Sequence, residues 1–228
     1  MSSENPKRAL FAGLAEIAKV LGHGHRLEIV ELLAQGERSV EALAERVSLP
    51  VANTSQHLRL MRRAGVLVSR RDGKRILYRP SDPSVLELTA ALRRVAERNA
   101  AEVRAVIGGY FRERDALEPV SRRELARRLR DGLVTVLDVR PADEFAAGHL
   151  PRAINIPLRE LRRRLREIPK SRAVVAYCRG PYCVLAYEAV ALLRRRGFKV
   201  RRLEDGFPEW KAAGLPVESA LTPPGSAR

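Results

Sequence analysis

Two cysteines stand five positions apart in the second half of the chain, at Cys178 and Cys183. The apolar run that ends in Cys178 is typical of a buried strand, and an apolar helical run begins near Val184. A cysteine at such a turn faces backbone N–H groups and the positive end of the helix dipole, which favour the thiolate. The sequence therefore predicts a nucleophilic Cys178, followed by an anion-binding loop made of Arg179, Gly180, Pro181, Tyr182 and Cys183.

Cys183 has two interpretations. Its thiol can attack a persulfide on Cys178 and form a disulfide or trisulfide, which would make it a resolving cysteine. Alternatively, it is an incidental small residue at the start of a helix. We favour the resolving role.

A second group of polar residues, in the first half of the chain, suits nucleic acid. Residues 59–79 contain eight Lys or Arg and one acid. In the helical run before them, Leu58 and Met61 fall on one side with Val51, and Gln56 lies opposite. Asn and Gln pair with adenine and Arg with guanine, whereas a basic hairpin suits phosphates. The predicted contacts are Asn53, Gln56, Arg59 and Arg63 on the helix, and Arg70, Arg71, Lys74, Arg75 and Arg79 on the hairpin.

The elements that position this second group are short. Helical periods are predicted at 10–21, 27–33, 39–47 and 51–64. Two strand-like stretches, 66–70 and 75–79, then flank the hairpin signal Asp72-Gly73. A long helix is predicted from Asp82 to about Arg114. Helix, turn, helix and basic hairpin in this order predict a mainly helical winged helix-turn-helix.

The cysteines lie in a segment of different character. A capping box at 121–124 opens a new helix. Strand-like runs at 134–139, 173–177 and 199–203 then alternate with helical runs at 158–168 and 184–196, which predicts an α/β domain with a largely parallel sheet. We therefore expect two domains, at 1–115 and 119–217, joined near 112–120 and followed by a flexible tail at 218–228.

Composition limits the class of protein. With 228 residues, 45% hydrophobic and 31% charged, the chain is that of an ordinary globular protein. The net charge of +16 does not locate a DNA site, because residues 121–228 carry most of the excess. No signal peptide and no membrane-spanning run is evident, so we expect a cytoplasmic protein with no membrane contact, whose cysteines are reactive thiols. No cofactor is expected.

The first half resembles the ArsR-type bacterial repressors over roughly residues 8–110. The resemblance rests on Arg26–Leu33, Ser55–Leu58 and Arg63–Val68. It implies a homodimer held by the first and last helices, which binds double-stranded operator DNA with two half-sites. It also implies that Ser55, Gln56 and His57 read bases.

The chain departs from that family's metal-sensing patterns. Residues 37–43 contain no cysteine, and residues 82–114 contain neither Cys nor His. His23 and His25 lie in a Gly-rich turn and are interpreted as turn residues. No metal site is predicted, so the signal is expected to enter elsewhere.

The second half resembles the rhodanese family over roughly residues 119–215. The matching stretches are Leu137–Arg140, Glu144-Phe145, Gly148–Pro157, Tyr177–Gly180, Gly197-Phe198 and Leu203–Phe207 with Trp210. The resemblance implies that Cys178 takes sulfur as a persulfide from a sulfane-sulfur donor (thiosulfate, polysulfide or persulfide). It implies that Asp138 and Arg140 support the loop. A sister group acting on phosphate or arsenate would need Arg at position 184, where this chain has Val184, so that chemistry is disfavoured.

These features lead to three hypotheses. The first is a transcriptional repressor that senses reactive sulfur through Cys178. The second is a sulfurtransferase whose DNA-binding domain is accessory. In the third, the rhodanese-like half is a catalytically silent interaction module on an ordinary repressor. Sulfur turnover favours the second, and failure of Cys178 to form a persulfide favours the third.

Overall fold

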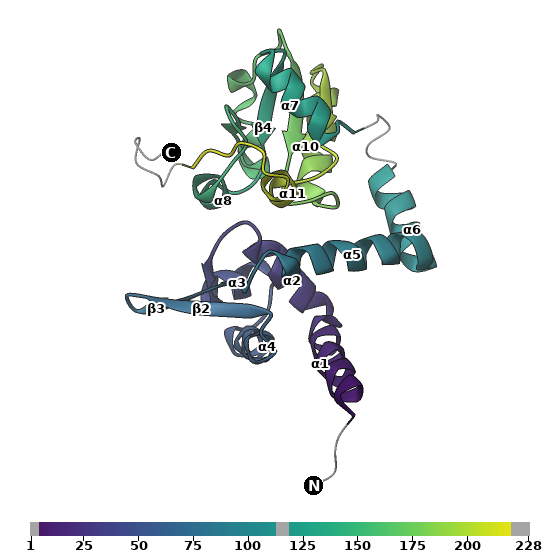
Figure 1. Ribbon diagram of the computed structural model, residues 1–228. Helices are drawn as coiled ribbons and strands as arrows, with labels where there is room; N and C mark the ends of the chain where they lie inside the picture. Colours follow the sequence, from purple (N-terminus) through teal and green to yellow (C-terminus); the bar gives the residue numbers. More distant parts are fainter. Residues whose placement is uncertain (1–4, 113–118, 220–228) are drawn as a thin grey trace. The chain divides into compact units, whose positions relative to one another are not determined.

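The computed structural model describes residues 5–112 and 119–219, and these form two compact units that divide between Arg94 and Val95 (Figure 1). The first unit is mainly helical with a small winged sheet, and the second has a four-stranded sheet flanked by helices. The predicted fold class is confirmed. The division falls inside helix α5 (Ser84–Asn99), so the limits 1–115 and 119–217 remain sequence-based predictions.

The first unit begins with four helices, α1 (Pro6–Leu21), α2 (Gly24–Leu33), α3 (Val40–Arg46) and α4 (Val51–Arg63). Side-chain caps start two of them, because Asn5 accepts a hydrogen bond from the Lys7 amide and Ser39 accepts one from the Ala42 amide. The core between the helices is formed by fully buried apolar side chains: Ile29, Leu43, Leu58 and Met61. This core fixes α4 with one face inward and one face to solvent.

The hairpin has the predicted form. Strands β2 (Leu67–Asp72) and β3 (Arg75–Pro80) pair in antiparallel fashion, and Gly73 at the turn has φ +59°. Glycine adopts this left-handed conformation at no steric cost, as a two-residue hairpin loop requires. A two-residue strand, β1 (Arg38–Ser39), pairs with the other edge of β3; it is too short to show any periodicity in the sequence.

The single long helix predicted from Asp82 to about Arg114 is wrong. Helix α5 ends at Asn99, Ala100 is extended, and a new helix α6 (Ala101–Val106) leads into a π-helical turn η1 (Ile107–Arg112). The Asn99 side-chain amide donates to the carbonyl of Val95 at 2.9 Å, a local bond that competes with continuation of the helix. Residues 113 and 114 lie outside the described residues.

The sheet of the second unit is wholly parallel, with strand order β5-β4-β6-β7. Its strands are β4 (Val134–Asp138), β5 (Ile154–Asn155), β6 (Ala173–Tyr177) and β7 (Val200–Arg202). The helices are α7 (Arg122–Arg130), α8 (Ala142–Ala147), α9 (Leu158–Leu161), α10 (Val184–Arg195) and α11 (Phe207–Ala212), with a 3₁₀ turn η2 (Leu165–Glu167). The predicted helix at 158–168 is therefore a short α-helix followed by a separate turn.

Both faces of this sheet are buried. Val174 and Ala176 of β6 pack into one apolar cluster with α10, while Val175 and Tyr177 pack into a second cluster on the other face with Trp210 of α11. This alternation follows from the two-residue period of a strand. It explains why β6 reads as a continuous apolar run, and it fixes the end of the strand at the cysteine.

The predicted tail at 218–228 begins with two residues that the structure holds in place. Glu218 pairs with His149 through reciprocal backbone hydrogen bonds of 2.8 and 2.9 Å, and the Ser219 hydroxyl donates to the carbonyl of Ala146. Residues 220–228 lie outside the described residues. Within the described ranges, no helix has the length and apolar character needed to cross a membrane.

Candidate functional site

The two cysteines meet at the carboxyl end of β6. Cys178 directly follows the strand, Cys183 is the N-cap residue of α10, and a disulfide joins them across Cα atoms 6.1 Å apart. Only 1% of Cys178 and 8% of Cys183 is exposed. The helix N-terminus predicted behind the cysteine is thus present, and the loop is closed over the sulfur atoms.

Contacts from other elements hold this loop. The Arg179 guanidinium makes a bidentate ion pair with Glu144 of α8, with N–O distances of 2.7 to 3.1 Å, and Glu144 is fully buried. The Tyr187 hydroxyl donates to the Pro181 carbonyl at 3.0 Å. Glu144 is part of the rhodanese resemblance without an implied role, and Tyr187 carries no signal in the sequence, because neither is adjacent to the cysteines in the chain.

Gly206, the N-cap residue of α11, allows the chain before this helix to approach the cysteine loop closely. A Cβ atom at this position would lie 2.3 Å from the carbonyl carbon of Arg179 and from the amide nitrogen of Gly180. The next residue, Phe207, donates its amide to the Cys178 carbonyl at 3.1 Å. The start of α11 therefore holds the backbone of the loop, and only glycine fits at position 206 against Arg179 and Gly180.

Asp138 and Arg140 form a buried ion pair below the loop. Neither side chain is exposed, and their closest N–O distance is 2.6 Å. Arg140 also donates to the Gly148 carbonyl, and its guanidinium lies 4.5 Å from the centre of the Phe207 ring. The Tyr177 hydroxyl donates to Asp138. The pair thus contacts neighbours of the loop rather than the sulfur atoms, which is the arrangement that the supporting role requires.

Burial and charge set the protonation of this network. Burial by itself would lower the pKa of Arg140, but the Asp138 carboxylate and its hydrogen bonds raise this pKa above its usual value. Burial and the Asp138 carboxylate raise the pKa of Tyr177 well above its usual range. Arg140 is therefore charged and Tyr177 neutral at physiological pH.

Helix α4 presents its polar face to solvent. Asn53, Gln56, Arg59 and Arg63 are exposed, and Leu58 and Met61 are buried as predicted. Val51 was expected on the inner side, but it is 48% exposed. Thr54 takes the inner position, where its hydroxyl donates to the Pro50 carbonyl. This local bond satisfies the hydroxyl and lets a polar residue replace an apolar one in the core.

The five predicted phosphate-binding residues of the hairpin divide into two groups. Arg70 and Arg79 are exposed but both pair with Glu37, at 2.6 and 3.6 Å. Arg71, Lys74 and Arg75 are exposed around the turn.

His57 lies apart from the exposed residues of α4. Its ring centre is 4.7 Å from that of His23 and 6.2 Å from that of His25, and its buried Nδ1 has no hydrogen-bond partner. Desolvation, followed by the charges of His23, Arg26 and His25, lowers the pKa of His57. Ser55 is also half-buried. A base-reading role for Ser55 or His57 therefore rests on the resemblance alone.

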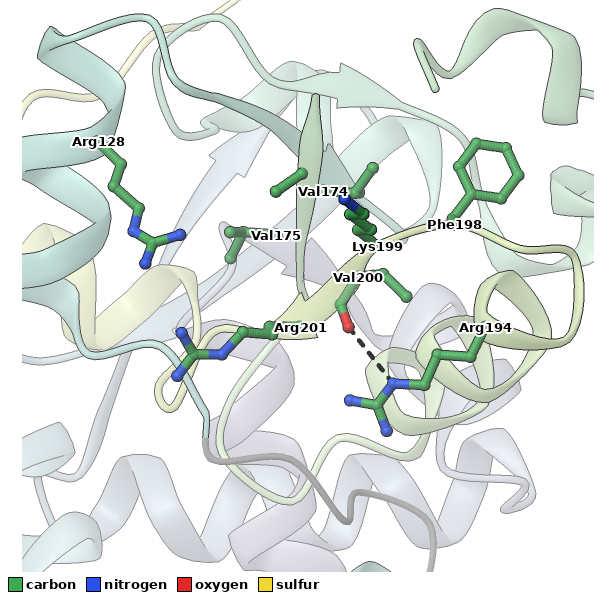
Figure 2. A pocket seen from close by; sticks show the side chains of 9 residues that line it. Arg128, Val174, Val175, Arg194, Phe198, Lys199, Val200 and Arg201 are labelled. Atoms are coloured by element: carbon green, nitrogen blue, oxygen red, sulfur yellow. Dashed lines mark hydrogen bonds between the residues drawn. The ribbon is translucent and has the colours of Figure 1, made fainter. Parts of the chain in front are cut away.

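A further hollow lies at the amino-terminal half of β6 and β7, away from the cysteines. Its volume is about 280 Å³, and Figure 2 shows the side chains that line it, which include the basic residues Arg128, Arg194, Lys199 and Arg201 and the apolar residues Val174, Val175, Val200 and Phe198. Arg128 and Arg201 both pair with Glu124, and Arg194 donates to the Val200 carbonyl. Three of the four cations are thus engaged within the domain. Among the described residues, no group of three or more His, Cys, Asp or Glu could hold a metal ion.

Comparison with known proteins matches both halves. A rhodanese-like domain model covers residues 121–213, and a helix-turn-helix domain model covers residues 21–70. The chain is 43% identical to the HTH-type transcriptional regulator Rv0324 of Mycobacterium tuberculosis, over 93% of each protein. It is 38% identical to a sulfurtransferase of Allochromatium vinosum, over 41% of this chain and 87% of that protein.

Among solved structures, the first half of the chain is similar to the homodimeric winged helix-turn-helix DNA-binding domain of Mb0332 from Mycobacterium bovis. That protein is described as a possible ArsR-family transcriptional regulator. It is 34% identical, covering 45% of this chain and 94% of that fragment, with a TM-score of 0.41.

Proposed function

This chain belongs to the family of HTH-type transcriptional regulators in which an ArsR-type helix-turn-helix domain is followed by a rhodanese-like domain, and from that premise we propose that it is a cytoplasmic homodimeric repressor controlled by reactive sulfur. The observation that carries the proposal is the pairing of Cys178 with Cys183 in one closed loop. A simple sulfur carrier needs only the first of these cysteines, whereas a reversible switch uses both.

The sulfur chemistry needs no reagent beyond the donor. The Cys178 thiolate attacks a sulfane sulfur of a polysulfide, the donor S–S bond breaks, and the remaining sulfur chain leaves with the electron pair. Cys183 thiolate then attacks Sγ of the Cys178 persulfide, and the terminal sulfur leaves as hydrosulfide. The polysulfide is reduced and the two thiols are oxidised to the disulfide. Asp138 and Arg140 take no part in these bonds; they hold Gly148, Tyr177 and Phe207, which lie next to the loop.

The dimer and the DNA contacts are supported by what the first unit exposes. Leu10, Phe11 and Leu14 of α1 are each more than half exposed, and Leu88 and Leu92 of α5 are 46% and 43% exposed. Apolar surface of this extent on two helices favours burial against a second copy. In such a dimer, the two α4 helices would read half-sites one helical turn of DNA apart.

We expect base reading and phosphate binding to separate by mutation. Gln56→Ala should weaken binding to the cognate operator by about 1–3 kcal/mol and relax preference at one base position. Arg71→Ala with Arg75→Ala should weaken binding to all sequences alike, and lower the slope of log affinity against log salt by about one per lost contact. Fluorescence anisotropy with operator and random duplexes, across salt concentrations, measures both. Equal losses on both duplexes for Gln56→Ala would exclude it from the reading face.

The central test is operator affinity before and after polysulfide. Cross-linking of the loop should weaken operator binding by about 5- to 150-fold, the usual range for coupled sites, and a thiol reductant should restore it. Cys178→Ser is the matched control, because it should bind the operator equally with and without polysulfide. Unchanged affinity of fully cross-linked wild-type protein would refute the sensor function.

A second function, sulfurtransferase, is favoured by the similarity to the Allochromatium sulfurtransferase. A Cys178 persulfide would then pass its sulfur to an external acceptor before Cys183 attacks. If the protein transfers sulfur from thiosulfate to a thiol acceptor over many turnovers, sulfurtransferase activity is favoured over sensing as its main function. Absence of any persulfide after donor exposure would leave the domain as an interaction module.

A further inference from the structure

The π-helical turn η1 brings an aromatic pair to the second unit. Gly108 and Gly109 lie in this turn, and a Cβ atom at either position would meet nothing within 4 Å. Tyr110 and Phe111 follow directly, with ring centres 5.0 Å apart. A π-turn is rare and frequently marks a functional site, and a glycine pair is a common place for a helix to bend. The backbone before Phe111 is therefore easy to deform.

Phe111 packs on the cysteine loop within the second unit. Its ring centre lies 5.1 Å from that of Tyr182 and 4.9 Å from that of Tyr187, the latter edge to face. Both distances are typical of favourable aromatic pairs. Tyr182 is the loop residue next to Cys183, so one ring contact joins η1 directly to the cysteine pair.

The two tyrosines differ in how they are held. Tyr187 is 4% exposed on α10, the Arg202 guanidinium lies 4.4 Å from its ring centre, and its hydroxyl donates to Pro181. Tyr182 belongs to the loop itself, whose backbone path depends on the bond between the cysteines. Tyr187 is thus the fixed side of the contact with Phe111, and Tyr182 the side that moves with the loop.

We propose that Phe111 senses the state of the Cys178–Cys183 loop and passes it to helix α6. This inference rests on the proposed function. In the disulfide-bonded loop Cys178 is 1% exposed and Cys183 is 8% exposed, so breaking the S–S bond and adding a sulfur atom to Cys178 requires the buried loop to rearrange. Opening the disulfide shifts Cys183 and its neighbour Tyr182, which removes one wall of the Phe111 site. Phe111 then leaves, and the Gly108-Gly109 turn lets α6 change its course.

The test is amide hydrogen exchange, read by mass spectrometry on peptides that cover residues 101–112. Reduced and cross-linked full-length protein should differ by about fivefold or more in exchange rate there, with the cross-linked form slower. Phe111→Ala should exchange fast in both states, and Phe111→Tyr should keep the difference because it keeps the ring. Val106→Ala is the matched control, since Val106 lies on α6 and is 59% exposed; it should behave as wild type.

The outcomes separate this inference from the proposed function. Equal exchange in the two states of wild type, or an undiminished difference in Phe111→Ala, would overturn the role of Phe111. Operator affinity is measured on the same samples. A state-dependent exchange without a change in affinity would refute the sensor function and leave the Phe111 contact standing. A change in operator affinity without a change in hydrogen exchange would support the sensor function and refute the role of Phe111.

Discussion

Cys178→Ser is expected to abolish persulfide formation and to reduce sulfur transfer to the level of a protein-free control. A serine hydroxyl is not ionised at neutral pH and cannot hold sulfane sulfur, whereas a thiolate at the carboxyl end of β6 can. The substitution removes little volume from the buried site, so the fold and operator binding of the untreated protein should remain within a few-fold of wild type. Mass spectrometry after polysulfide exposure, with a sulfurtransferase assay, measures the two losses.

Cys183→Ser is the matched variant for that experiment. It should gain one sulfur atom on Cys178 and keep it, whereas the wild type loses that sulfur as hydrosulfide when Cys183 forms the cross-link. Persistent sulfur transfer by the Cys178→Ser protein would show that another group is the nucleophile. If Cys183 is the resolving cysteine, neither variant should form the cross-link, and only Cys183→Ser should carry a persulfide on Cys178.

The second large effect is expected from the buried pair below the loop. Arg140→Met should lower the free energy of unfolding of the second domain by about 3–5 kcal/mol, because it leaves the Asp138 carboxylate buried without its cation. The double variant Asp138→Leu with Arg140→Met should lose less than Arg140→Met alone, since removing both charges removes the uncompensated one. Urea unfolding gives these values.

Trp210 makes the measurement specific to one domain. It is the chain's single tryptophan, and it is 1% exposed in the apolar cluster of the second unit. Its fluorescence therefore reports unfolding of that unit alone. Operator binding by Arg140→Met should persist while sulfur loading falls with stability. A loss below about 1 kcal/mol would mean that the pair does not carry the support that its burial indicates.

The elements around both sites could be predicted because each has a local signal. Alternating strand and helix periods locate β6 and α10, and a hairpin needs little more than Gly73 between two strand-like runs. Half of the capping box predicted at 121–124 is also present, since the Ser121 hydroxyl accepts a hydrogen bond from the Glu124 amide, but the Glu124 carboxylate pairs with Arg128 and Arg201. These features depend on a few neighbouring residues, so one sequence contains enough information.

Contacts between distant segments left no such signal. Glu144 is 35 residues from Arg179, and although it belongs to the rhodanese resemblance, no neighbouring residue in the sequence indicates that its fully buried carboxylate pairs with Arg179. Phe111 looks like one more apolar residue of a long helix, until the break at Ala100 and the glycine pair turn it to Tyr182. Val51 was expected on the inner side of α4 because it is apolar, but Thr54 lies there instead, and its bond to the Pro50 carbonyl satisfies the buried hydroxyl.

The burial of both sulfur atoms has a consequence for timing. Reduction of a disulfide needs a thiolate to approach one sulfur in line with the bond, and in the closed loop that path is covered. The disulfide forms from an open loop that a sulfur donor can enter quickly. Its reduction is slower, because a reductant can attack only after the closed loop has opened. A repressor of this design would keep a memory of a sulfur pulse after the pulse has ended, with a duration set by the protein and not by the donor concentration.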